Sequence, residues 1–127
     1  PVLAVTGNKD ANLRKFLPAG RHLIINGIPV YMNHGIGSFA HYFKERMIGV
    51  TKGYLFERYK KFLDQNAAGA RVIIFGDVHR VECRWINRTF YFNPGSASLG
   101  YRLNKPISFG VLDFADLDTP RGIIIPF

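Results

Sequence analysis

The sequence predicts a mixed α/β fold, and three features lead to this prediction. Two hairpins centre on Asn26-Gly27 and Asn87-Arg88, which separate apolar or alternating runs. Asn-Gly is typical of a tight hairpin turn because both of its central positions need a positive φ angle. Aromatic residues keep helical spacing within residues 38–66, and the β-branched run at 72–75 is typical of a buried strand.

The other elements follow from local patterns along the chain. Residues 12–17 fit a single helical turn, and residues 38–66 fit two amphipathic helices with a break near Gly49 and Gly53. Polar, Gly-containing turns are expected at 6–10 and 93–96. The remaining strands are expected over residues 2–5, 22–25, 28–32, 82–86, 89–92, 107–114 and 122–125.

Length and composition indicate one globular domain over residues 1–127. The chain is 47% hydrophobic and 20% charged, which separates it from disordered proteins. Its one cysteine, Cys83, cannot form an internal disulfide. The first residues lack the pattern of a signal peptide, and no apolar run approaches the roughly 20 residues of a membrane span. We therefore expect a cytoplasmic protein with no membrane partner.

The formal net charge of +8 favours an anionic partner. A phosphoester, a nucleic acid or an acidic surface would fit, and so would a charge that serves only solubility. Basic residues lie among the aromatics of the helical region, as a solvated face or as a basic lid for a phosphate-bearing substrate. A nucleic-acid-binding module is a further alternative, although no nucleic-acid motif accompanies the charge. His41, in the same region, is interpreted as an ordinary helix residue.

Three strands end in turns that hold metal-competent side chains. The turns are Gly-Asn-Lys-Asp at 7–10, Asn-His-Gly at 33–35 and Gly-Asp-Val-His at 76–79. Because ligands gather beyond the carboxyl ends of strands, one pocket is expected to contain Asn8, His34, Asp77 and His79. Asp77 and His79 are two apart and would point the same way in an extended chain. Amide, carboxylate and imidazole groups suit a pair of divalent ions that activates water for phosphoryl displacement.

These motifs, together with Asn-Pro-Gly-Ser at 93–96, resemble those of the calcineurin-like metallophosphoesterases. The resemblance runs from about residue 2 to 114. It is strongest to the small prokaryotic phosphodiesterases that share their fold with a retromer subunit of eukaryotes. It implies a four-layer α/β/β/α sandwich of two mixed sheets and a metal-dependent phosphoesterase, a phosphodiesterase in particular. In such an enzyme a metal-activated hydroxide attacks the phosphoester substrate.

The resemblance also implies a role for each matching residue. Asn8, His34 and Asp77 would bind the second metal, and His79 the first. His34 is also the candidate catalytic residue for proton transfer. Asp77 stands where the family has histidine, and an oxygen donor there favours Mn²⁺ or Mg²⁺ over Zn²⁺. Manganese is therefore the expected ion, with zinc, iron and nickel as alternatives. The residues expected to support the site are Gly7, Asp10, Gly35, Gly76, Asn93 and Ser96.

In the family, an Asp-x-His and a Gly-Asp motif precede the Gly-Asn motif, which here begins at position 7. We therefore expect the fold to be incomplete at its N-terminus and to lack most ligands of the first metal. Exposed strand edges would favour association, and a homo-oligomer is one such outcome. The alternative function is a catalytically silent scaffold of the same fold that acts in protein–protein interaction.

Overall fold

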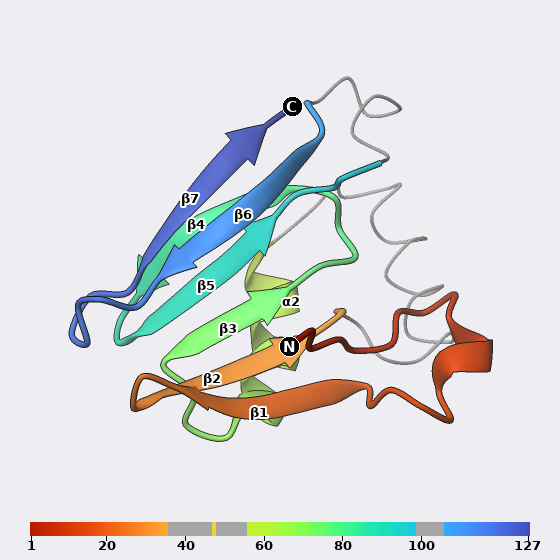
Figure 1. The fold of residues 1–127 in the computed structure, drawn as a ribbon, viewed down its shortest axis with the longest axis horizontal. Coiled ribbons are helices and arrows are strands. Elements are labelled where there is room, and N and C mark those ends of the chain that lie inside the picture. The colour runs from red at the N-terminus through yellow and green to blue at the C-terminus, as the bar shows by residue number, and fades with distance from the viewer. Residues whose placement is uncertain (36–46, 48–55, 99–105) are drawn as a thin grey trace.

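A five-stranded mixed sheet forms the centre of this computed structural model, which describes residues 1–35, 47, 56–98 and 106–127 (Figure 1). Across the sheet the strand order is β1-β2-β3-β5-β4. The inner strands β2, β3 and β5 run parallel, and β1 and β4 pair antiparallel at the two edges. The strands are β1 (Gly20–Ile25), β2 (Ile28–Asn33), β3 (Val72–Phe75), β4 (Val81–Ile86) and β5 (Thr89–Pro94).

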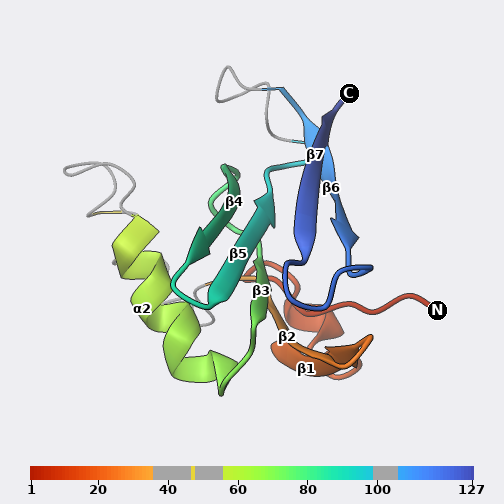
Figure 2. The ribbon, with the colours of Figure 1, turned by 90° about the vertical axis from the view of Figure 1, so that its left-hand side faces the viewer.

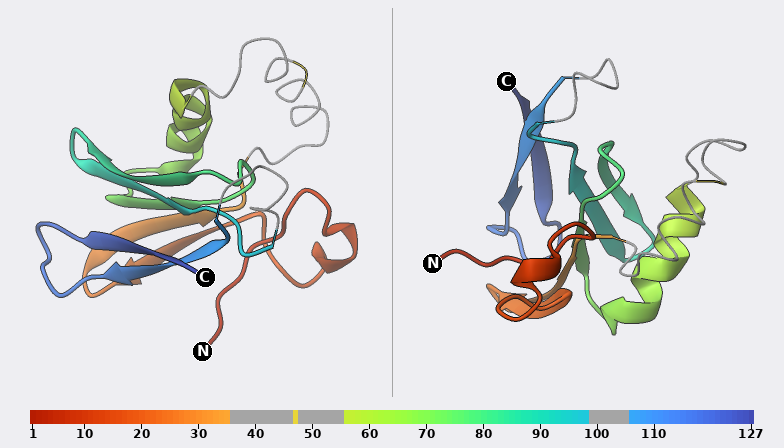
Figure 3. Two further views of the ribbon diagram at one scale, coloured as in Figure 1. Left: turned by 90° about the horizontal axis from the view of Figure 1, so that it is seen from above. Right: turned by 90° about the vertical axis from the view of Figure 1, so that its right-hand side faces the viewer.

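The described residues form three layers. Helix α2 (Phe56–Ala67) covers one face of the central sheet. The antiparallel hairpin of β6 (Ser108–Asp113) and β7 (Arg121–Pro126) covers the other face (Figures 2 and 3). A short 3-10 helix, η1 (Ala11–Leu13), precedes β1. In the part of the chain that the structure describes, every helix is too short or too polar to span a bilayer.

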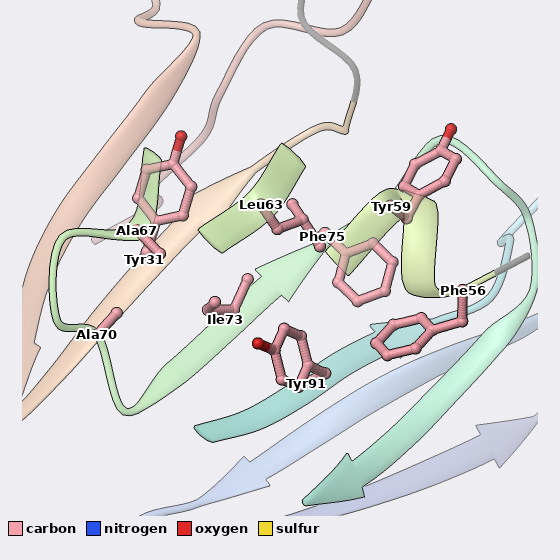
Figure 4. Packing of buried hydrophobic residues seen from close by; sticks show 9 residues of the cluster. All are labelled: Tyr31, Phe56, Tyr59, Leu63, Ala67, Ala70, Ile73, Phe75 and Tyr91. Carbon is pink, nitrogen blue, oxygen red and sulfur yellow. The ribbon is translucent and has the colours of Figure 1, made fainter. Parts of the chain in front are cut away.

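Helix α2 buries one face against the sheet. Its buried residues Phe56, Tyr59, Leu63 and Ala67 recur every three or four positions, the spacing of an amphipathic helix. Aromatic rings dominate the packing, and the ring of Phe56 meets that of Tyr91 edge to face at 5.4 Å. The remaining members of this buried cluster, shown in Figure 4, are Tyr31, Ala70, Ile73 and Phe75.

The β6–β7 hairpin lies against the opposite face of the sheet because two of its residues are glycines. A Cβ atom at Gly110 would lie 2.3 Å from the ring of Phe92, and one at Gly122 would lie 2.5 Å from it. Real Cβ atoms do not approach other atoms this closely, so the Phe92 ring fits only under a strand without side chains at these positions. Leu112 and Ile124 complete the contact.

The hairpins and the central strand predicted from the sequence are confirmed. Asn26 and Gly27 have φ angles of 50° and 80°, as a type I′ turn requires. The second hairpin turns at Asn87, whose φ is 53°. The predicted buried strand at 72–75 is β3. The first predicted helix and His41 lie outside the described residues, whereas the second predicted helix corresponds to α2.

The strand predicted at residues 2–5 is wrong. No strand pairs with this segment among the described residues, and Val2 is 95% exposed. The segment is held by the Arg21 side chain, which donates to the carbonyl of Ala4 at 2.8 Å, and by Thr6 N, which donates to the carbonyl of Pro18 at 2.9 Å. An apolar run forms a strand only where another strand satisfies its backbone groups. The helical turn expected at 12–17 is shorter and begins earlier, as η1.

Candidate metal centre

The parallel strands β2, β3 and β5 have their carboxyl ends along one edge of the sheet, which is distinct from the edges formed by β1 and β4. Hydrogen bonds join these ends. The backbone N–H of Gly76, after β3, donates to the carbonyl of His34, after β2, at 2.9 Å. The Asn93 side chain, on β5, donates to the carbonyl of Gly76 at 3.1 Å. The three strand ends at this edge are therefore held together, and the side chains that follow the strands lie close to one another.

Three of the four predicted ligands meet at this edge. The Asn8 Nδ2 donates to Asp77 Oδ1 at 3.2 Å, although the two residues are 69 positions apart. The His34 Nε2 lies 3.7 Å from the same oxygen. The Asp77 side chain is only 4% exposed, whereas the His34 side chain is 33% exposed. The structure thus gathers an amide, an imidazole and a buried carboxylate around one point.

The loop that carries Asn8 is fixed by Asp10 and by the absence of a side chain at Gly7. The backbone N–H of Gly7 donates to Asp10 Oδ2 at 2.8 Å. A Cβ atom at Gly7 would lie 3.2 Å from Cε1 of His34, and one at Gly76 would lie 3.7 Å from Nδ1 of the same ring. The His34 ring therefore lies between two glycines, which leave it room.

The backbone turns sharply at Asp77. Its φ is 69°, and Val78 N donates to the carbonyl of Gly76 at 2.8 Å, which closes a three-residue turn. Gly35, with a φ of 148°, lies against it, and a Cβ atom there would be 2.6 Å from Cβ of Asp77. His79 also has a positive φ, of 50°. The chain is therefore not extended from Asp77 to His79, and the spacing of two gives no reason for their side chains to share one direction.

His79 lies on the wall of a neighbouring hollow of about 450 Å³ that Glu82 and Arg84 also line. It makes no hydrogen bond or ion pair with Asn8, His34 or Asp77. Asn8 and His34 share a different hollow, of about 250 Å³. The structure therefore places His79 on a different hollow from Asn8 and His34, and its ligand role stays a prediction.

The 93–96 turn, at the carboxyl end of β5, is held beside the same strand ends by hydrogen bonds. Asn93 is fully buried, and its Oδ1 accepts from Gly95 N at 3.0 Å. The carbonyl of Ser96 accepts from Ser108 N at 3.0 Å, and Ser108 Oγ donates to the carbonyl of Pro94 at 2.6 Å. These bonds tie the turn to β6.

A family model described as the calcineurin-like phosphoesterase superfamily domain matches residues 1–117. The chain belongs to this superfamily. A comparison with curated proteins gave no match.

Solved structures share the fold of this calcineurin-like phosphoesterase domain. A Thermotoga maritima protein is 25% identical, with a TM-score of 0.55 over 98% of this chain. An archaeal phosphodiesterase is 16% identical, with a TM-score of 0.60 over 97% of this chain. The Entamoeba histolytica protein Vps29, solved with Zn²⁺, is 18% identical, with a TM-score of 0.63 over 98%. The chain spans 65% of the T. maritima protein and 68% of each of the other two.

The donor types in this calcineurin-like phosphoesterase domain suit a divalent ion. An imidazole nitrogen, a carboxylate oxygen and an amide oxygen are ligands for Mn²⁺, Mg²⁺ or Zn²⁺. Asn8 would present its amide oxygen in place of Nδ2 after a half-turn of the side-chain amide, because the oxygen and the NH₂ group have nearly the same shape. Within the described residues, no group of three or more His, Cys, Asp or Glu side chains is placed to hold a metal. A site with three protein donors at this position would therefore have to include the amide of Asn8.

Two contacts at this edge were not foreseen from the sequence. The Tyr59 hydroxyl donates to Asp77 Oδ2 at 2.7 Å, and Asn33 Oδ1 accepts from Gly35 N at 2.6 Å. Tyr59 is one of the aromatic residues with helical spacing, and its ring is buried against the sheet. The spacing carries no information about where its hydroxyl points.

Proposed function

We propose that this domain is the metal-binding part of a metal-dependent phosphoesterase, a phosphodiesterase in particular. The observation that carries the proposal is the meeting of Asn8, His34 and Asp77 from three separate segments at one end of the sheet. Membership of the superfamily supports the same reaction class. These three residues would hold one divalent ion, and His79 would contribute to a second.

The residues of the chain would have distinct tasks in this reaction. A divalent ion held here would lower the pKa of water and offset phosphoryl charge. Asp77 is buried and fixed by its neighbours, so it would hold the ion. His34 is partly exposed and could exchange a proton with the substrate or leaving group. Arg14 lines the hollow of Asn8 and His34 and would attract the anionic phosphoester, as would the net charge of +8.

Two measurements on the chain test the proposal. Isothermal titration with Mn²⁺ should show binding, which His34→Ala and Asp77→Ala should each weaken by at least about tenfold. The matched control is His22→Ala, since His22 is an exposed histidine on β1 and should leave Mn²⁺ binding unchanged. Hydrolysis of bis-p-nitrophenyl phosphate should require the added Mn²⁺. Absence of Mn²⁺ binding by the unsubstituted chain would overturn the proposal.

The second candidate is a catalytically silent scaffold for protein–protein interaction. It is favoured by the hydrogen bonding of Asp77, because Asn8 and Tyr59 donate to its two oxygens. Under this hypothesis the cluster serves only to join segments of the fold. Mn²⁺ would then not raise the midpoint of thermal unfolding, whereas a bound ion would raise it in proportion to the logarithm of its concentration.

A further inference from the structure

The two oxygens of the Asp77 carboxylate have different surroundings. Oδ1 faces Asn8 Nδ2 at 3.2 Å and His34 Nε2 at 3.7 Å. Oδ2 accepts from the Tyr59 hydroxyl at 2.7 Å. The side chain is 4% exposed, so little water competes for either oxygen. Oδ1 therefore faces the candidate metal centre, and Oδ2 is bonded to Tyr59 of α2.

The Tyr59 hydroxyl is held in place by the packing of its ring. Tyr59 is 9% exposed and belongs to the buried cluster under α2, and its ring centroid lies 6.4 Å from that of Phe75. Its hydroxyl extends from the edge of this cluster (Figure 4). The bond to Asp77 satisfies this hydroxyl, as a buried phenol requires. Tyr59 therefore fixes the rotation of the carboxylate from the protein side.

The backbone removes the remaining freedom of Asp77. The tight turn with a φ of 69° fixes the direction of its Cα–Cβ bond, and Gly35 lies against it, since a Cβ atom there would be 2.6 Å from Cβ of Asp77. Turning the carboxylate so that Oδ2 also faced Asn8 and His34 would break the bond from Tyr59, so this bond favours the orientation in which Oδ1 alone faces them.

We propose that Tyr59 is a positioning residue that makes Asp77 a one-oxygen donor and so selects against large cations. This inference rests on the proposed function, since it concerns the same metal position. Ca²⁺ takes six to eight oxygen ligands and often binds both oxygens of one carboxylate, whereas Mg²⁺ keeps six ligands at shorter distances and Zn²⁺ usually takes four. A carboxylate restricted to one oxygen therefore disfavours Ca²⁺ relative to smaller ions.

The test compares Tyr59→Phe with the unsubstituted chain in titrations with Mn²⁺ and with Ca²⁺. The variant keeps the ring and removes only the hydroxyl, so both oxygens of Asp77 become available. The preference for Mn²⁺ over Ca²⁺ should fall by about tenfold. The visible absorption of bound Co²⁺ should also change, because it responds to the number of ligands. Neither readout depends on catalytic activity.

Tyr91→Phe is the matched control. Tyr91 belongs to the same buried cluster, and its hydroxyl likewise donates to a carboxylate, that of Asp64. Its loss should destabilise the fold without changing the Mn²⁺ to Ca²⁺ preference. An equal change in both variants would overturn the proposal, since it would then reflect a loosened core.

Asp77→His supplies a second comparison, because an imidazole has no second oxygen to restrain. In that background Tyr59→Phe should leave the ion preference unchanged, and a change there would overturn the positioning role. If the unsubstituted chain binds Mn²⁺ but Tyr59→Phe keeps its ion preference, this inference fails and the proposed function stands. If the unsubstituted chain binds neither ion, both fail.

Discussion

Gly35 and Asp77 touch so closely that no side chain fits between the ends of β2 and β3. A Cβ atom at Gly35 would lie 2.6 Å from Cβ of Asp77, and Gly35 has a φ of 148°. We predict that Gly35→Ala lowers the free energy of unfolding by roughly 3 kcal/mol, from the clash and the unfavourable φ together. Urea unfolding followed by circular dichroism measures this loss.

The control is Gly27→Ala, in the first hairpin. Gly27 also has a positive φ, of 80°, but a Cβ atom there would meet nothing within 4 Å. Its substitution should cost only the conformational term, about 1 kcal/mol. Equal losses at the two glycines would show that the contact with Asp77 is not a constraint.

Asn93 holds the end of β3 through its side-chain amide. It is fully buried and bonds both the carbonyl of Gly76 and the N–H of Gly95. We predict that Asn93→Ala lowers the free energy of unfolding by roughly 3 kcal/mol, because two partly buried backbone groups lose their partner. Asn66→Ala, which removes an exposed bond to the carbonyl of Phe62, should change it by less than about 0.5 kcal/mol.

Glu82 is a buried carboxylate that depends on Arg84. The Glu82 side chain is 6% exposed, and Arg84 Nε donates to it at 2.7 Å while its guanidinium lies 4.6 Å from the centre of the Phe56 ring. Arg84→Ala leaves the charge unpaired and should cost about 3 kcal/mol in chemical denaturation. The exposed Arg88 in the hairpin turn serves as the control for loss of a positive charge.

The Glu82→Gln/Arg84→Ala double variant tests the origin of this cost. It should be more stable than Arg84→Ala alone, because a neutral amide is less costly to bury than a charge. A double variant no more stable than the single one would attribute the loss to the packing of Arg84 on Phe56 instead.

We predict that the protein loses stability at high pH because of Tyr91. Burial, with a further contribution from the hydrogen bond to Asp64, raises the pKa of Tyr91 from its ordinary value of 10.0 to about 12. The unfolded chain therefore loses this proton near pH 10, whereas the folded chain retains it until about pH 12. Stability from this group is complete below pH 10 and declines as the pH rises toward 12.

Urea unfolding midpoints across this pH range measure the decline. Tyr91→Phe should unfold more easily at neutral pH but should lose less stability between pH 10 and 12. The same decline in the variant would assign it to other groups.

The parts of the fold that depend on local chemistry were predictable from sequence. The Asn26-Gly27 turn fixes its hairpin by itself, and the β-branched run that became β3 is buried wherever it lies. Residues 2–5 have the same apolar character, yet they form no strand because none of the described strands lies beside them. A strand is a property of a pair, and one segment's sequence does not specify its partner.

For the site, the sequence was enough to predict which residues lie near one another, but not how their side chains are oriented. The order of strand ends was enough to expect Asn8, His34 and Asp77 at one edge, where the structure has them. It was not enough to orient His79, since that depends on a positive φ at Asp77 that non-glycine residues seldom adopt. Nor could spacing reveal the Tyr59 hydroxyl bond, which depends on how far α2 stands from β3.

The contact between Asn8 and Asp77 spans 69 positions of the chain, and this separation has a kinetic consequence. The hairpins join residues close in sequence and can form within microseconds. Closing the long loop between Asn8 and Asp77 costs more chain entropy and should come late in folding. A cation that binds there would therefore slow unfolding far more than it speeds folding. Its effect on stopped-flow traces would lie almost entirely in the unfolding limb.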